Sequence, residues 1–161
     1  MTQLYEGSFD GRNLRVAVIA ARFNETIVKQ LVEGALDCLK RHTVKDADIS
    51  LVWVPGAFEI PATAKRLAAS GEVDAIVCLG AVIRGETAHF DYVASHASNG
   101  IGAIALETGL PIANGILTTE NVAQATDRAG GKMGNKGFEA ALAALEMANL
   151  YASLPKPAPG L

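Results

Sequence analysis

The chain of 161 residues has few of the features that mark secreted, membrane or nucleic-acid-binding proteins. Its only cysteines, Cys38 and Cys78, lie inside apolar segments, which favours buried free thiols in a reducing cytoplasm over a disulfide. The longest apolar run, residues 75–83, is well short of the roughly 20 residues that cross a bilayer. Glu6 and Asp10 precede any apolar stretch, unlike in a signal peptide. We therefore expect a cytoplasmic protein with no membrane partner.

An excess of charge and the short motifs of cofactor sites are also missing. The 14 Lys and Arg residues against 17 Asp and Glu give a net charge of −3, so nothing in the charge favours a nucleic-acid partner. The sequence contains no GxGxxG, Walker A, CxxC or HExxH pattern. We expect no metal, no cofactor and no covalent nucleophile. Because half of the residues are apolar, the chain has ample material for a folded core.

Short runs rich in β-branched residues alternate with segments of helical apolar periodicity. Strands are predicted over residues 14–20, 49–54, 74–83 and 111–117, and helices over residues 24–41, 58–70, 88–106, 119–129 and 138–153. Asn24, and Thr118 or Thr119, are the predicted N-caps of two of these helices. Pro61 is compatible with a helix only in the first turn, and Gly71 is a predicted helix end.

This alternation predicts an α/β fold, a four-stranded parallel sheet with helices on both faces, joined by right-handed crossovers. No linker or repeat divides the chain, so residues 1–161 are predicted to form one domain. Residues 1–12 are predicted to be extended and could add a strand to the sheet of a neighbouring subunit. Residues 130–137 form a predicted glycine-rich hinge, and residues 154–161 a predicted disordered tail.

Ligands of open parallel sheets bind beyond the carboxyl ends of the strands. The segment there with the clearest chemistry is RGETAH (residues 84–89). Gly85 permits a sharp turn, and the N–H groups that open the following helix can bind an anion; an ordinary strand-to-helix loop is the alternative. His89 is placed for proton transfer beside that anion, or is a surface histidine. His42 and His96 lack such a setting and are interpreted as structural.

Other residues at the same edge also allow two interpretations. Phe23 could stack on a planar heterocycle or pack against the neighbouring helix. Phe58 and Glu59 could form an apolar wall with a hydrogen-bonding carboxylate, or an ordinary acidic helix start. Three cations flank the glycine hinge, where they suit phosphate binding or are solvated charges: Arg128, Lys132 and Lys136. The residues alone thus support a small phosphorylated substrate and a planar ring.

Six stretches match, in order and without a gap, the pattern of one enzyme family: ARFN (21–24), VPGAFEIP (54–61), GAVIRGETAHFDY (80–92), PIANGILTT (111–119), DRAG (127–130) and GNKG (134–137). Through them, residues 4–153 resemble the 6,7-dimethyl-8-ribityllumazine synthases of riboflavin biosynthesis. The resemblance implies a flavodoxin-like three-layer sandwich. It also implies a transferase that condenses 5-amino-6-(D-ribitylamino)uracil with 3,4-dihydroxy-2-butanone 4-phosphate, giving 6,7-dimethyl-8-ribityllumazine, phosphate and water, with no cofactor.

The resemblance further implies a role for each matching residue. His89 would transfer protons, and Arg128 would complete the phosphate site and stabilise the leaving group. The loop residues that would hold the phosphate are Gly85, Glu86 and Thr87. The residues that would bind the heterocycle and its ribityl chain are Phe23, Asn24, Ala57, Phe58, Glu59, Ala81, Val82, Ile83, Asn114 and Lys136. Position 114 is often aromatic in the family, so Asn114 would contribute a backbone contact in place of a stacked ring.

The family forms pentamers whose sites lie between neighbouring subunits, with Arg128 and the hinge contributed across the interface. The short hinge of residues 130–137 resembles that of members in which twelve pentamers form an icosahedral shell of sixty subunits, with which riboflavin synthase could associate. A non-catalytic flavin- or lumazine-binding homologue and a cage-forming homologue are the alternatives. A mere binder leaves unexplained why His89 stands beside an anion loop while Arg128 and Lys136 lie in a distant hinge.

Overall fold

A computed structural model describes residues 1–160 and shows a four-stranded, all-parallel sheet at the centre of the molecule. Its strands are β1 (Val16–Ala21), β2 (Ile49–Val54), β3 (Ala75–Ile83) and β4 (Ile112–Thr119), in the order β2-β1-β3-β4. Every residue of β1 is buried, because this strand lies inside the sheet with helices on both sides. The α/β fold class predicted from the sequence is confirmed.

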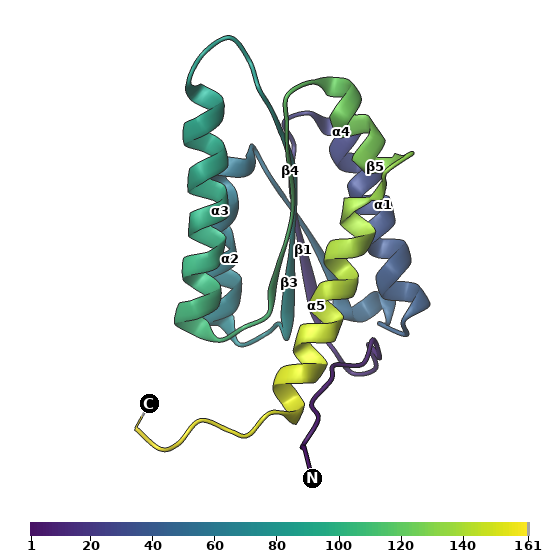
Figure 1. The fold of residues 1–161 in the computed structure, drawn as a ribbon, viewed down its shortest axis with the longest axis vertical. Helices are drawn as coiled ribbons and strands as arrows, with labels where there is room; N and C mark the ends of the chain where they lie inside the picture. Colours follow the sequence, from purple (N-terminus) through teal and green to yellow (C-terminus); the bar gives the residue numbers. More distant parts are fainter. Residues whose placement is uncertain (161) are drawn as a thin grey trace.

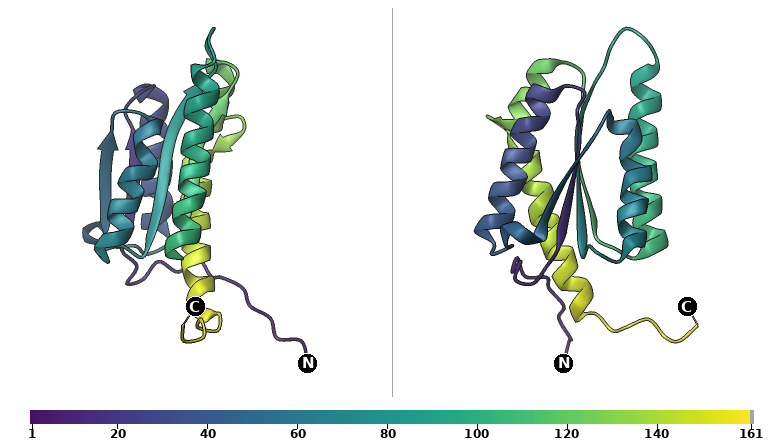
Figure 2. Two further views of the ribbon diagram at one scale, coloured as in Figure 1. Left: turned by 90° about the vertical axis from the view of Figure 1, so that its left-hand side faces the viewer. Right: turned by 180° about the vertical axis from the view of Figure 1, so that it is seen from behind.

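Helices cover both faces of the sheet (Figure 1; Figure 2). On one face lie α1 (Glu25–Arg41), α4 (Val122–Arg128) and α5 (Lys136–Ser153), and on the other α2 (Ile60–Ser70) and α3 (His89–Thr108). Alternate residues of β1 divide between two cores, with Val18 toward α1 and α5 and Ile19 toward α2 and α3. The half-buried Trp53 of β2 packs against the α1–α5 core.

The ends of α2 agree with the sequence prediction, whereas the start of α4 does not. Pro61 lies in the first turn of α2, after a 3-10 turn (η2, Ala57–Glu59), and Gly71 ends α2 in the left-handed conformation, both as predicted. The predicted caps Thr118 and Thr119 are wrong. Both belong to β4, and Asn121 caps α4 through a hydrogen bond from the Gln124 N–H.

The segment predicted as a glycine-rich hinge is a small hairpin. β5 (Ala129–Gly131) pairs antiparallel with β6 (Gly134–Asn135), and Gly130 and Gly134 both have positive φ. The Asn135 side chain caps α5 by accepting from the Phe138 N–H at 3.1 Å and donates to the Gln30 carbonyl of α1 at 3.0 Å. The hairpin is therefore attached to α1 rather than free to hinge.

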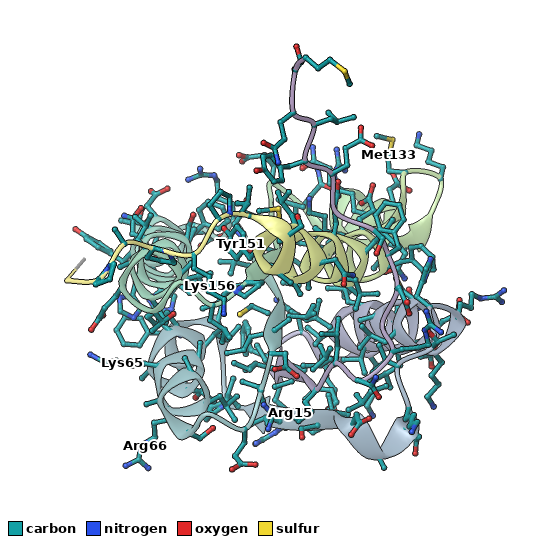
Figure 3. The ribbon with its side chains drawn as sticks, turned by 90° about the horizontal axis from the view of Figure 1, so that it is seen from below. Arg15, Lys65, Arg66, Met133, Tyr151 and Lys156 are labelled. Atoms are coloured by element: carbon teal, nitrogen blue, oxygen red, sulfur yellow. The ribbon has the colours of Figure 1, made fainter. Side chains whose placement is uncertain are left out.

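The amino ends of the strands lie at the end of the molecule where both termini leave it (Figure 1; Figure 3 views this end). Residues 1–11 form no helix or strand, yet the Asn149 amide of α5 donates to the carbonyls of Ser8 and Asp10. A second short 3-10 turn, η1 (Asp46–Asp48), precedes β2. Residues 154–160 are exposed, without helix or strand. Among the described residues, no helix is long and apolar enough to cross a membrane.

Candidate active site

A pocket of about 700 Å³ lies beyond the carboxyl ends of β1 and β3, at the edge of the sheet that the sequence indicated. This end is uppermost in Figure 1, where the chain passes from β3 over to α3. The pocket collects segments that are far apart in the sequence, and ten of the predicted site residues line it. The full lining is Phe23, Pro55, Gly56, Ala57, Phe58, Glu59, Ala81, Val82, Ile83, Gly85, Thr87, His89, Phe90 and Val93.

Hydrogen bonds fix the segments that follow the strands to one another. The N–H of Arg22 donates to the Val54 carbonyl at 2.8 Å, and that of Phe23 to the Pro55 carbonyl at 3.0 Å. Asn24 takes the N-cap position of α1 as predicted, but its side chain makes no cap bond. Its amide instead donates to the Ala81 carbonyl of β3 at 2.7 Å, which ties the loop after β1 to the floor of the pocket.

Two aromatic side chains form exposed walls. Phe23 is 73% exposed and Phe58 is 53% exposed, which is too open for core packing within one chain. The ring of His96 stacks on Phe58, with centroids 4.1 Å apart and an interplanar angle of 24°. His96 was interpreted as structural from the sequence, and that interpretation missed its contact with the pocket wall. The available signal was its spacing of two helical turns from His89.

Glu59 lies where both interpretations of its sequence position require it, directly before a helix and at the edge of the pocket. It precedes α2 directly, with its N–H bonded to the Gly56 carbonyl at 3.2 Å, and its exposed side chain also borders the pocket. A carboxylate there accepts hydrogen bonds from an amine or hydroxyl of a ligand. Its role in binding the heterocycle remains a prediction.

The loop from Gly85 to Ala88 carries free backbone donors at the rim of the pocket, which Gly85 and Thr87 line. Within residues 1–160, the N–H groups of Glu86, Thr87 and Ala88 donate to no protein acceptor. α3 starts at once after this loop, so its dipole adds to the attraction for an anion. The Thr87 hydroxyl accepts from the His89 N–H at 3.4 Å, which places that side chain at the helix start.

His89 is the first residue of α3 and is exposed to the same cavity as Gly85 and Thr87. An imidazole here can give or take a proton beside an anion bound by the loop. Cys78 lies deeper in β3, where burial raises the pKa of its thiol to about 12. The thiol therefore stays protonated at neutral pH and is no nucleophile. Residues 1–160 contain no group of three or more His, Cys, Asp or Glu side chains arranged to hold a metal ion.

Five predicted site residues do not line this pocket: Asn24, whose amide bonds to the Ala81 carbonyl beneath it, and four others. Glu86 is exposed and does not border it, whereas Asn114 borders a second cavity of about 470 Å³ between β4 and α3. Arg128 lies in the last turn of α4, where its guanidinium donates to the Gln124 carbonyl at 3.0 Å, and Lys136 opens α5. Neither Arg128 nor Lys136 borders either cavity within one chain. The single chain thus carries its candidate groups in two separate places.

Comparison with known proteins accounts for this combination of fold and pocket. Residues 13–152 match the model of the family described as 6,7-dimethyl-8-ribityllumazine synthase. The chain belongs to that family. Two proteins named 6,7-dimethyl-8-ribityllumazine synthase, from two strains of Clostridium kluyveri, are 51% identical to it over 152 residues, covering 94% of this chain and 99% of theirs. The lumazine synthase match contains all four strands of the sheet, the loop before α3 and the β5–β6 hairpin.

Proposed function

We propose that the pocket condenses 5-amino-6-(D-ribitylamino)uracil with 3,4-dihydroxy-2-butanone 4-phosphate to give 6,7-dimethyl-8-ribityllumazine, phosphate and two molecules of water. The observation that carries the proposal is the content of one cavity. Exposed aromatic rings for a planar heterocycle, a loop with unpaired backbone donors for a phosphate, and an imidazole all contribute to its lining. Membership of the lumazine synthase family supplies the identity of the two substrates.

The chemistry begins with attack of the 5-amino group on the ketone carbon, and loss of water gives an imine. Removal of the proton from the neighbouring carbon then lets the electron pair expel the phosphate from the terminal carbon. The resulting enol becomes a ketone, and the ribitylamino nitrogen attacks it. Loss of the second water closes the ring. No electrons enter or leave the system, so the sequence of steps requires no redox partner.

In this scheme each side chain acts on a particular step. Phe23 and Phe58 hold the pyrimidine, and Glu59 accepts hydrogen bonds from its polar groups. The N–H groups of residues 86–88 bind the phosphate and stabilise it as it leaves. His89 moves protons between the attacking amine, the carbon beside the imine and the departing water.

Much of the rate enhancement in this scheme comes from holding two reactants together, which can contribute about 7–11 kcal/mol to lowering the barrier. We therefore expect His89→Ala to slow the reaction without abolishing it, because the pocket still aligns the substrates. The matched variant His89→Gln keeps a hydrogen-bonding group but cannot exchange protons. Its rate should resemble that of His89→Ala in a steady-state assay.

A neighbouring subunit completes the site in this proposal. Arg128, Lys136 and Asn114 lie away from the pocket of their own chain, and the resemblance assigns the hinge to the site of the next subunit. An arginine brought to the anion loop would neutralise the phosphate and would be a second stabiliser of the leaving group. The site is therefore complete only in the oligomer.

The test is an assay with both substrates that follows lumazine absorbance and fluorescence. We expect product above the uncatalysed background and a strong loss of rate in Arg128→Ala. Arg66→Ala, which removes an exposed arginine of α2, is the matched control and should retain the full rate (Figure 3). If the folded, assembled protein gives no rate above background, the proposal of synthase activity is wrong. The alternative of a non-catalytic homologue that binds flavin or lumazine would then remain.

Mixing two impaired variants tests the shared site. Subunits carrying His89→Ala and subunits carrying Arg128→Ala are dissociated, mixed in equal amounts and reassembled. If each site takes His89 from one subunit and Arg128 from the next, random mixing restores about a quarter of the sites. If both residues act within one chain, the mixture has only the average activity of its two components.

The proposal extends to the oligomeric state of the protein and to its location in the cell. A pentamer, closing into an icosahedral shell, is supported by the short connection between β5 and α5, and residues 1–6 extend away from the body of the subunit as a strand-adding segment requires (Figure 2). Light scattering distinguishes a pentamer from a shell. Riboflavin synthase, which would use the product, is the proposed associated enzyme. A cytoplasmic location is supported by the unpaired, buried Cys38 and Cys78.

A further inference from the structure

Arg84 connects three elements at the base of the anion loop. It is the first residue after β3, and its Nε donates to the Glu120 carboxylate beyond β4 at 2.8 Å. Its Nη1 lies 3.4 Å from the Asp91 carboxylate in the first turn of α3. The guanidinium carbon also lies 4.4 Å from the centre of the Phe90 ring. One side chain therefore joins the residue before the loop to the two residues that follow His89.

The loop itself has little other support. All residues from Arg84 to His89 are exposed, and a Cβ placed on Gly85 would meet no atom within 4 Å. The backbone N–H of Arg84 donates to the Thr119 carbonyl at 2.9 Å, which fixes only the start of the loop. Phe90 also packs against the α2–α3 core, which holds the start of α3. The contacts of the Arg84 side chain with Phe90 and Asp91 join the two ends of the loop to each other directly.

Charge gives Arg84 a second effect on the same loop. Asp91 and Glu120 place two carboxylates beside a segment that must attract a phosphate dianion. Paired with Arg84, they present one net negative charge, whereas without it they present two. An unpaired carboxylate within a Debye length, about 8 Å at physiological salt, repels the incoming phosphate. Arg84 does not border the pocket, so it would act on the loop without touching substrate.

We propose that Arg84 is a positioning residue for the phosphorylated substrate: it holds the two ends of the anion loop together and cancels one of the two negative charges beside it. The substrate named here rests on the function proposed above. The contacts predict an effect on the phosphate half of the site alone, because Arg84 contacts neither Phe23 nor Phe58.

The experiment compares Arg84→Met with Arg84→Lys and measures KM for each substrate separately. Arg84→Met keeps the length and apolar body of the side chain but removes the charge. We expect it to raise KM for the phosphorylated ketone about five- to tenfold, because the anion loop loses a connection between its ends and the phosphate meets one more negative charge. KM for the pyrimidine should stay within about twofold, since small differences of this size reflect no lost contact. Arg84→Lys keeps the charge but lacks the forked guanidinium. Its KM for the phosphorylated ketone should lie between those of Arg84→Met and the wild type.

A second substitution separates the charge effect from general damage. Adding Glu120→Gln to Arg84→Met removes the freed carboxylate charge and should lower KM for the phosphorylated ketone again. A parallel rise of KM for both substrates in Arg84→Met would indicate a general distortion of the pocket and overturn the proposal, as would no change in either KM. If Arg84→Met does not fold, Arg84→Lys is compared with the wild type instead. We then expect KM to rise about two- to threefold for the phosphorylated ketone and not for the pyrimidine.

Inorganic phosphate is a probe that does not depend on turnover. Its dissociation constant, measured by ³¹P NMR line broadening on the assembled protein, should rise in Arg84→Met by the same factor as KM. If the wild-type protein makes no lumazine, the proposed function fails, while phosphate binding still tests Arg84. Equal phosphate affinity in wild type and Arg84→Met would overturn the role of Arg84 whether or not the enzyme is active.

Discussion

The side-chain amide of Asn24 donates to the main-chain carbonyl of Ala81 across the carboxyl ends of two adjacent strands, at 2.7 Å. The bond links the first loop of the pocket to its floor. Asn24 also has φ = +62°, a left-handed conformation that asparagine tolerates better than most residues. Asparagine at position 24 therefore meets two requirements: it tolerates the left-handed backbone and supplies the hydrogen-bond donor.

Substitution of Asn24 should separate these two requirements. Asn24→Gly removes only the hydrogen bond, whereas Asn24→Ala removes it and places a Cβ in the left-handed region. We expect Asn24→Ala to have a free energy of unfolding about 1 kcal/mol lower than that of Asn24→Gly. Chemical denaturation at one protein concentration measures both. Equal stabilities would show that the left-handed conformation contributes nothing.

The stack of His96 on Phe58 should affect binding of the pyrimidine. Removing the imidazole in His96→Ala leaves Phe58 without its partner, and aromatic pairs of this kind are worth about 0.5–1.5 kcal/mol. We expect KM for the pyrimidine to rise and kcat to stay nearly unchanged. His96→Phe restores a stacked ring and should restore KM. An unchanged KM in His96→Ala would mean that Phe58 keeps its orientation alone.

The ion pair of Arg15 with Asp74 should make the free energy of unfolding fall at acidic pH. It joins the residues that precede β1 and β3, at the end of the molecule that Figure 3 views. Burial tends to raise the pKa of Asp74, but the hydrogen bonds and charge of Arg15 outweigh it and hold that pKa below 3.8. Because the folded-state pKa is the lower one, the stabilisation is complete well above pH 3.8 and disappears as the pH falls through the folded value.

Asp74→Asn should therefore be less stable than wild type at neutral pH, and the difference should narrow below about pH 4. Denaturant titrations at several pH values measure the difference in free energy of unfolding between the two proteins. Glu72→Gln is the matched control, because the Glu72 carboxylate lies 3.8 Å from Arg15 on the surface and its ion pair contributes little. A gap between Asp74→Asn and wild type that stays constant into acid would contradict this assignment.

Gly137, the single glycine of α5, should not tolerate a larger residue. A Cβ at this position would overlap the Leu31 carbonyl oxygen of α1 and lie 2.7 Å from its carbon. We expect Gly137→Ala to destabilise the protein by about 3 kcal/mol, because backbone atoms cannot move aside. Gly102→Ala in α3 is the matched control, with no atom within 4 Å of the new Cβ. It should be neutral or stabilising by up to about 1 kcal/mol.

The strands and the pocket edge could be predicted because each depends on a local pattern. Residues 49–54 were predicted as a strand with the bounds that β2 has, and the rule for open parallel sheets selected the loops that now line one cavity. The cap of α4 was missed because β4 continues through Thr118 and Thr119, so pairing with β3 outweighed their preference for a helix start.

Other parts of the site could not be deduced from local patterns. The hairpin of residues 129–135 forms because Asn135 attaches it to α1, a contact between residues 105 positions apart. The distance of Arg128 from the pocket also follows from the packing of α4 on the other side of the sheet. The contacts of Arg84 with Glu120, which lies 36 residues further along the chain, also cannot be deduced from the sequence around either residue.

Trp53 gives the protein an optical property of its own. It is the single tryptophan of the chain, and it packs against the α1–α5 core two residues before Pro55 at the pocket rim. All indole fluorescence therefore arises from one place in the fold. Its emission wavelength follows the polarity around one strand, so that unfolding of the sheet can be followed without an added label.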